Sequence, residues 1–241
     1  MSSVSPFFTD QLLFIVFPYV AFVVFILFSI RRYLMQSFTY SSLSSQFLEN
    51  KQHFWGLVPF HYGIIVILTG HFVAFLIPRE IIAWNNEPLR LYILEIAAFV
   101  FALLTLIGLT SIIIRRFTTP KMKIVTSPAD WILLTILGIQ VLSGMFVAVF
   151  HSWGSTWYAA TATPYLWSLI TFNPDISYIT AMPWMVKVHI IGAFVIIAFF
   201  PFTRLVHALV VPNPYLWRKP QVVRWYGIKR LIRQSTDKTV I

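Results

Sequence analysis

Five runs of about 20 apolar residues dominate this sequence, and an α-helix of that length crosses the hydrocarbon of a bilayer. Too few polar side chains remain to cover a water-soluble protein of 241 residues, because 58% of the chain is hydrophobic and only 11% is charged. The sequence therefore predicts an all-α membrane protein, a bundle of five transmembrane helices forming a single domain over residues 1–241. The expected spans are approximately Gln11–Ile30, Phe54–Ile77, Leu91–Ile114, Trp131–Phe150 and Trp184–Val211.

The basic residues fall mainly on one side of these spans. Three follow the first span, four follow the third and seven lie in the tail 212–241, whereas the stretches Met1–Asp10 and His151–Met185 contain none. Because Lys and Arg accumulate in cytoplasmic connections, this asymmetry predicts an external N-terminus and a cytoplasmic C-terminus. The net charge of +10 then reflects orientation and attraction to anionic membrane lipid, and no nucleic-acid partner is expected.

The connection Ser152–Pro183 is the longest external stretch and is rich in Trp and Tyr. Aromatic side chains of this kind favour the boundary between lipid headgroups and hydrocarbon. We expect this segment to lie on the membrane surface, with its aromatic residues in the interfacial belt.

Four of the six histidines lie inside two of the apolar runs: His61 and His71 in the second, His189 and His207 in the fifth. An imidazole in hydrocarbon is costly unless it has a partner, and two histidine pairs on facing helices are what two stacked haems would need. The absence of cysteine excludes covalent c-type attachment and a thiolate-bound iron–sulfur cluster within this chain. The pattern predicts two non-covalently bound haems.

Depth in the membrane decides how the histidines pair. The second and fifth spans run in opposite directions, so His71 and His189 lie near the outer face and His61 and His207 near the cytoplasmic face. The axial rises differ, because the ten residues from His61 to His71 rise about 15 Å and the 18 residues from His189 to His207 about 27 Å. Helix tilt, an inclined macrocycle and a bend at Pro201 must absorb this difference.

The small and basic residues beside these histidines can each be interpreted in two ways, as part of a haem site or as ordinary features of a membrane helix. Gly63, Gly70 and Gly192 would leave room for a flat cofactor, but glycine also lets membrane helices approach closely. Arg204, one turn before His207, is a candidate partner for a haem propionate, or simply a further basic residue near the cytoplasmic face. His53 and His151 lie near the ends of spans, where ordinary interfacial histidines are expected.

The chain also resembles a known family, the γ subunit of membrane-bound respiratory nitrate reductase, a cytochrome b with five spans. The resemblance extends over nearly the whole sequence. It is carried by Ser44-Ser45-Gln46, the stretch His61 to Gly70-His71-Phe72, Arg115-Arg116 with Pro120, Ala129-Asp130, Ile139-Gln140, Phe200-Pro201-Phe202 with Arg204-Leu205 and His207, Val211-Pro212, Tyr215-Leu216 and Arg218-Lys219.

The resemblance implies an oxidoreductase subunit of the cytoplasmic (inner) membrane, working as part of a quinol:nitrate oxidoreductase in anaerobic respiration. Two haem b groups would be held by His71 with His189 near the outer face and by His61 with His207 near the inner face. Quinol would be oxidised near the outer haem. Electrons would pass to an iron–sulfur β subunit docked on the basic cytoplasmic face, tail included, and then to a molybdenum catalytic α subunit that reduces nitrate.

The family carries a lysine associated with the quinol site just before the third span. Here Leu91 occupies that position and Arg90 precedes it. With His71 and Gly70, Arg90 is therefore the candidate quinol-binding residue, although its forked guanidinium is not equivalent to an ammonium group. No catalytic side chain of this chain's own is predicted.

Three alternatives remain open at this point. The chain could be a cytochrome b that serves a heterodisulfide-reducing or sulfite-reducing complex, or one that serves a nitrite oxidoreductase working in the reverse direction. It could also be a haem-free transporter or assembly scaffold, whose histidines only form hydrogen bonds between helices.

Overall fold

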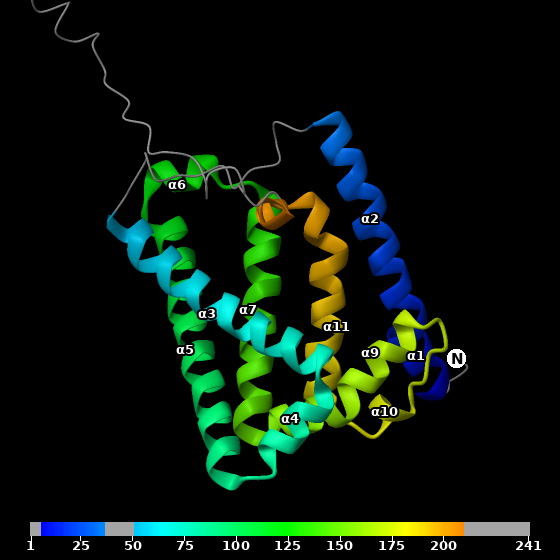
Figure 1. Ribbon diagram of the computed structural model, residues 1–241. Helices are drawn as coiled ribbons and strands as arrows, with labels where there is room; N and C mark the ends of the chain where they lie inside the picture. Colours follow the sequence, from blue (N-terminus) through cyan, green and yellow to red (C-terminus); the bar gives the residue numbers. More distant parts are fainter. Residues whose placement is uncertain (1–5, 37–50, 210–241) are drawn as a thin grey trace, which may run out of the picture. The chain divides into compact units, whose positions relative to one another are not determined.

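The computed structural model describes residues 6–36 and 51–209, and these form an all-helical bundle (Figure 1). Five helical stretches within them are long and apolar enough to cross a membrane: Phe8–Met35, Phe54–Leu76, Pro88–Thr118, Pro128–Phe150 and Trp184–Phe202. At most 22% of the residues in their most apolar windows are buried, so most of this apolar surface is left to face lipid. The prediction of five spans is confirmed. The tail 212–241, predicted to dock partner subunits, lies outside the described residues.

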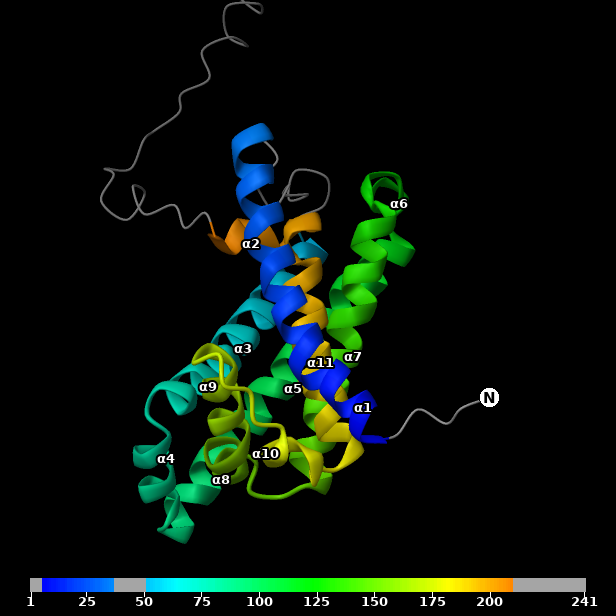
Figure 2. The ribbon, with the colours of Figure 1, turned by 90° about the vertical axis from the view of Figure 1, so that its right-hand side faces the viewer.

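The first span combines α1 (Pro6–Gln11), a π-helical stretch (Leu12–Val16) and α2 (Phe17–Met35). Helices α3 (Lys51–Leu76), α5 (Pro88–Thr118), α7 (Pro128–Phe150) and α11 (Trp184–Phe199) supply the other four. Short helices α4 (Pro78–Asn85) and α6 (Pro120–Val125) connect them. Helix α7 packs between α5 and α11, whereas α3 crosses the bundle obliquely, as the two views in Figure 1 and Figure 2 show.

Five of these helices begin with proline, at Pro6, Pro78, Pro88, Pro120 and Pro128. Proline suits the first helical position because its missing N–H would have no partner there. Helix α7 has a capping box in addition, in which the Ser127 side chain accepts from the Asp130 N–H and the Asp130 carboxylate accepts from the Ser127 N–H. The helix starts are therefore well specified by the sequence.

Helices α3 and α5 pack closely because glycine lies at their crossing. A Cβ added to Gly108 would lie 2.3 Å from the Phe60 nitrogen, and one added to Gly63 would lie 2.3 Å from the Thr105 hydroxyl oxygen. Such contacts are too short for any side chain, so the crossing requires glycine at both positions. Of the two readings of Gly63, the structure supports close helix approach.

The connection between α7 and α11 folds into α8 (Gly154–Trp157), a π-helical stretch (Tyr158–Ala162), α9 (Thr163–Ile170) and α10 (Ser177–Thr180). Part of this segment is core rather than surface. Tyr165 is fully buried in a cluster with Phe14, Ala21 and Phe194, and its hydroxyl donates to the Phe14 carbonyl at 2.7 Å. The expectation that its aromatic residues form an interfacial belt is therefore wrong for Tyr165, because that hydroxyl has a buried partner.

The fifth apolar run does not form one helix to Val211. Helix α11 ends at Phe199 and is followed by 3-10 turns at Phe200–Phe202 and Arg204–Leu209, with the buried Pro201 in the first of them. Proline has no N–H to continue the α-helical ladder, and Thr203 is extended. The predicted bend at Pro201 is confirmed, but the α-helix of the fifth span, predicted to run to about Val211, already ends at Phe199.

Candidate functional site

The four histidines singled out from the sequence lie on two facing parts of the bundle. His61 and His71 are on α3, His189 is on α11, and His207 is in the 3-10 turn Arg204–Leu209. Because the helix stops at Phe199, the direction of the His207 ring is set by the turn and not by an unbroken helical face shared with His189.

His61 and His207 face one another, with ring centres 6.2 Å apart and ring planes inclined at 65°. The Nδ1 atom of His61 lies 2.8 Å from the Leu57 carbonyl oxygen, and that of His207 lies 2.6 Å from the Arg204 carbonyl oxygen. A carbonyl can only accept, so Nδ1 carries the proton in each neutral ring and Nε2 keeps its lone pair. Both imidazoles are thus prepared as ligands through Nε2.

The spacing of this pair fits a shared metal ion. A metal–imidazole bond is about 2 Å long, so two imidazoles on opposite sides of one metal have ring centres roughly 6 Å apart. The described residues hold no cluster of three or more His, Cys, Asp or Glu that could bind a metal by themselves. Two opposed imidazoles suit a haem, whose porphyrin supplies the remaining ligands to the iron.

The structure does not bring His71 and His189 together as it does His61 and His207: the His71 ring contacts Tyr158, and the His189 ring faces Ser143 and Gly144 of α7. The Nδ1 atom of His71 lies 2.9 Å from the Ile67 carbonyl oxygen, and its imidazole is exposed, whereas His189 is partly buried. An exposed imidazole at this depth in a membrane helix is costly without a partner.

Helix α7 supplies two polar neighbours of His189, Ser143 and Gln140, to which the sequence assigned no role. The Ser143 hydroxyl lies 3.0 Å from His189 Nδ1 and donates to the Gln140 carbonyl, so the hydroxyl oxygen is free to accept from the ring. The Gln140 amide nitrogen donates to the His189 carbonyl at 3.1 Å and lies 3.4 Å from Nε2. The Ser143 contact places the proton of His189 on Nδ1, as in the other pair, but the Gln140 amide lies beside Nε2 and would have to move before Nε2 could bind a metal.

Glycines make room around His189 and leave space beside His71. A Cβ at Gly144 would lie 2.8 Å from the His189 ring, and a Cβ at Gly192 would lie 2.2 Å from the Gln140 side-chain oxygen. A Cβ at Gly70 would meet nothing within 4 Å. The missing side chain at Gly192 therefore leaves room for the Gln140 side chain. The space beside Gly70 is compatible with a flat cofactor or substrate.

Three side chains from the connection between α7 and α11 hold the end of α3 that carries His71. They donate to main-chain carbonyls: Tyr158 to His71, Thr163 to Ala74 and Trp167 to Phe75. The last carbonyls of a helix lack partners within it, so the bonds to Ala74 and Phe75 replace missing hydrogen bonds, whereas Tyr158 adds a second donor to the His71 carbonyl. The ring of Tyr158 also meets the His71 imidazole edge-on, with centres 5.1 Å apart.

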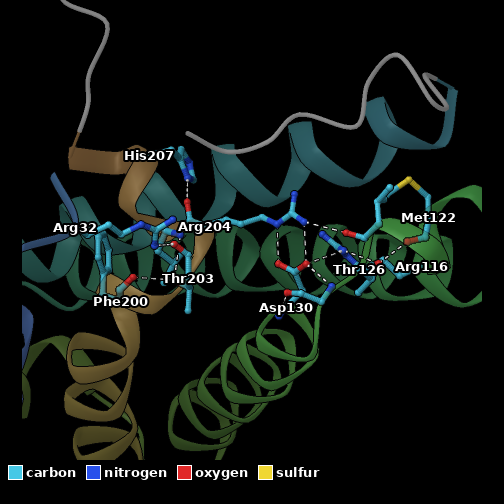
Figure 3. A network of polar contacts seen from close by, with 12 residues as sticks. Arg32, Arg116, Met122, Thr126, Asp130, Phe200, Thr203, Arg204 and His207 are labelled. Atoms are coloured by element: carbon cyan, nitrogen blue, oxygen red, sulfur yellow. Dashed lines mark hydrogen bonds and ion pairs between the residues drawn. The ribbon is translucent and has the colours of Figure 1, made fainter. Parts of the chain in front are cut away.

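Arg204 binds Asp130 of α7 through two hydrogen bonds, from Nε to Oδ1 at 2.7 Å and from Nη2 to Oδ2 at 2.9 Å. Its Nη2 also lies 3.1 Å from the Val125 carbonyl oxygen. Figure 3 shows Arg204 between Asp130 and His207. The predicted role of Arg204 toward a propionate stays a prediction.

The profile of the nitrate reductase gamma subunit family matches residues 10–226. The nitrate reductase gamma chain of Bacillus subtilis (strain 168) is 32% identical over 220 residues, covering 90% of this chain and 98% of the relative. The respiratory nitrate reductase 1 gamma chain of Escherichia coli (strain K12) is 31% identical over 222 residues, with the same coverage.

This chain belongs to the nitrate reductase gamma subunit family. The family consists of oxidoreductase complex subunits, which agrees with the class predicted from the sequence. The nitrate reductase-like protein NarX of Mycobacterium tuberculosis (strain H37Rv) is also similar, at 26% identity over 213 residues. The matching part is 33% of that longer protein.

The candidate quinol residue of this gamma-family chain, Arg90, is exposed in the first turn of α5. Its guanidinium lies 5.3 Å from the ring centre of Trp84 on α4, a cation–π arrangement. Trp84 thus restrains Arg90 at this end of the bundle. No contact in the described residues tests whether Arg90 binds quinol.

The two histidines set aside in the sequence have different positions. His151 follows α7, where its carbonyl accepts from Trp157 Nε1 at 3.4 Å and its ring lies 6.2 Å from that of Phe146. These contacts of His151 involve none of the four histidines on α3, α11 and the Arg204–Leu209 turn. The side chain of His53 lies outside the described residues.

Proposed function

We propose that this chain is the dihaem cytochrome b subunit of a nitrate reductase complex, which oxidises quinol near the outer face and passes electrons through two b haems to a cytoplasmic iron–sulfur subunit. The proposal places the N-terminus outside and the C-terminus in the cytoplasm, in the cytoplasmic (inner) membrane. The observation that carries it is the opposed His61–His207 pair, 6.2 Å between ring centres with each Nδ1 bonded to a carbonyl. Membership of the gamma subunit family supports it independently.

His61 and His207 would hold the inner haem, and His71 and His189 the outer one. Each haem, when bound, supplies a one-electron carrier whose potential depends on its axial ligands and their hydrogen bonds. The chain contributes oriented imidazoles: the Leu57 and Arg204 carbonyls orient His61 and His207, the Ile67 carbonyl orients His71, and the Ser143 hydroxyl orients His189. Exposure of His71 in a membrane helix supports a partner group beside it.

Quinol would bind beside His71, Gly70 and Arg90. The open space next to Gly70 leaves room for a planar ring, and Arg90 offers fixed N–H donors at the same end of the bundle. Protons would leave on the outer side while electrons move inward. Charge moved against the membrane potential conserves about 2.3 kcal/mol per charge per 100 mV.

The cytoplasmic partners follow from the family resemblance and from charge. An iron–sulfur β subunit would dock on the basic side, which includes Arg31, Arg32, Lys121 and Lys123, and a molybdenum catalytic α subunit would reduce nitrate beyond it. The names of the relatives, nitrate reductase gamma chains, support nitrate as the terminal substrate.

The test uses the purified complex and follows the visible spectrum of b-type haem. In the wild type, quinol reduces the haems and nitrate reoxidises them. In His207→Ala, quinol still reduces the outer haem but nitrate does not reoxidise it; in His71→Ala, which lacks the outer haem, quinol does not reduce the inner haem. His151→Ala is the control and behaves as wild type. A wild-type complex without any b-type signal would instead favour a haem-free transporter or scaffold.

A further inference from the structure

We propose that Asp130 is a positioning residue for the inner ligand His207, acting through the side chain and main chain of Arg204. The inference rests on the proposed function, which makes His207 a haem ligand. It concerns a residue to which the sequence assigned no role.

The segment that carries His207 cannot rely on α-helical hydrogen bonds for its position. Helix α11 ends at Phe199, Thr203 has φ −118° and ψ −179°, and His207 lies in a short 3-10 turn. A 3-10 turn of this length has weaker internal hydrogen bonds than an α-helix. The position of this turn, and with it the Arg204 carbonyl that orients the His207 ring, must therefore be fixed by contacts from outside the turn.

Two arginine contacts supply that fixation, and Figure 3 shows both. Arg32 of α2 donates through Nη1 to the carbonyls of Pro201 and Thr203, at 2.6 and 2.8 Å. Arg204 at the start of the turn is held by the Asp130 carboxylate through two parallel hydrogen bonds. The forked geometry fixes direction as well as distance.

Asp130 is itself rigidly placed. Its side chain is 5% exposed, it accepts from the Ser127 N–H in the capping box of α7, and Arg116 of α5 lies 3.8 Å away. Arg116 in turn donates to Thr126, whose hydroxyl donates to the Met122 carbonyl. The carboxylate thus joins α5, α7 and the His207 turn at one buried point.

The last contact in the series from Asp130 to His207 is the one between the Arg204 carbonyl oxygen and His207 Nδ1, at 2.6 Å. This carbonyl belongs to the main chain, so a substitution of the Arg204 side chain leaves the acceptor in place and changes only where it is held. An Nδ1–H acceptor raises the basicity of a ligating imidazole and orients its ring. Without Asp130, the His207 ring loses its fixed orientation toward His61.

The experiment uses the assembled complex and compares Asp130→Asn with Asp10→Asn. Asp10 is the control because its carboxylate also forms an ion pair, 3.3 Å from the Lys187 ammonium near the start of α11. This ion pair does not involve His207 or Arg204. We expect Asp130→Asn to shift and broaden the low-spin paramagnetic resonance signal of the inner haem and to raise its midpoint potential, while the outer haem is unchanged. Asp10→Asn leaves the inner signal as in wild type.

A second variant separates positioning from general destabilisation. Asp130→Asn leaves a partly buried arginine without its carboxylate, whereas Asp130→Asn combined with Arg204→Gln removes both charges. The double variant should assemble with two haems and keep the altered inner signal. A wild-type resonance signal of the inner haem, in the single or in the double variant, overturns the proposal.

His207→Ala distinguishes this inference from the proposed function. If His207→Ala loses no haem, the haem assignment itself fails. If it loses the inner haem while Asp130→Asn changes nothing at that haem, only the positioning role fails.

Discussion

The hydroxyl of Tyr158 lies 3.3 Å from the main-chain oxygen of His71, and its ring meets the His71 imidazole edge-on. A residue of the long external connection therefore contacts the histidine proposed to face quinol. Burial raises the pKa of Tyr158 to about 12, so the hydroxyl stays protonated and able to donate near neutral pH.

Tyr158→Phe removes this hydrogen bond but keeps the ring. We expect a loss of about 1 kcal/mol in stability and a shifted resonance signal of the outer haem, with the inner haem unchanged. Because a tyrosine ordinarily titrates near pH 10, the effect should not vary between about pH 6 and about pH 9. Tyr178→Phe, at a side chain that is 40% exposed, is the control. An outer haem signal identical to wild type would argue against the contact.

The α3–α5 crossing gives a prediction about stability. Gly108→Ala places a Cβ 2.3 Å from the main-chain nitrogen of Phe60, so the helices must separate, at a cost of about 1–3 kcal/mol. Gly138→Ala on α7 is the matched control, because its Cβ would meet nothing within 4 Å. Thermal unfolding in detergent should show a lower midpoint for Gly108→Ala only. Equal midpoints would mean that the crossing is looser than the structure has it.

Arg90 gives a prediction about quinol. If its guanidinium binds quinol, Arg90→Gln should raise KM for quinol about tenfold with a smaller change in kcat, the pattern of lost substrate binding. Arg79→Gln, in the same connection between the second and third spans, should leave KM near the wild-type value. Steady-state assays with a soluble quinol analogue measure both. Equal KM values for quinol in the two variants would show that Arg90 does not bind quinol.

The orientation can be tested because the chain has no cysteine. Phe172 between α9 and α10 and Ile124 in α6 are 82% and 86% exposed, and both are apolar, so a cysteine at either position should react freely. A membrane-impermeant thiol reagent added to intact cells should label Phe172→Cys at once and Ile124→Cys only after the cells are opened. The opposite pattern would invert the proposed topology.

The sequence predicted the spans well because length and hydropathy alone decide which helices can cross a bilayer. It failed at the end of the fifth run. The 27 Å rise expected between His189 and His207 assumes an unbroken helix, whereas Pro201 and the extended Thr203 end the α-helix first. The bend was expected from Pro201, but its effect on the ring of His207 depends on contacts made by Arg32 and Asp130.

The supporting residues could not have been found from spacing. Asp130 and Arg204 are 74 residues apart, and Tyr158 and His71 are 87 residues apart. Their pairing depends on how α7 and the external connection pack, which no local pattern records. Gln140 and Asp130 did occur in the stretches that carried the family resemblance, and that was the available signal for them.

The count of haem b per chain in paired histidine variants tests the central claim most directly. We expect two haems in the wild type and one in the variant that combines His61→Ala with His207→Ala, because both changes remove the same site. The variant combining His61→Ala with His189→Ala should contain none. One haem remaining in this cross-paired variant, or none in the His61–His207 variant, would contradict the pairing.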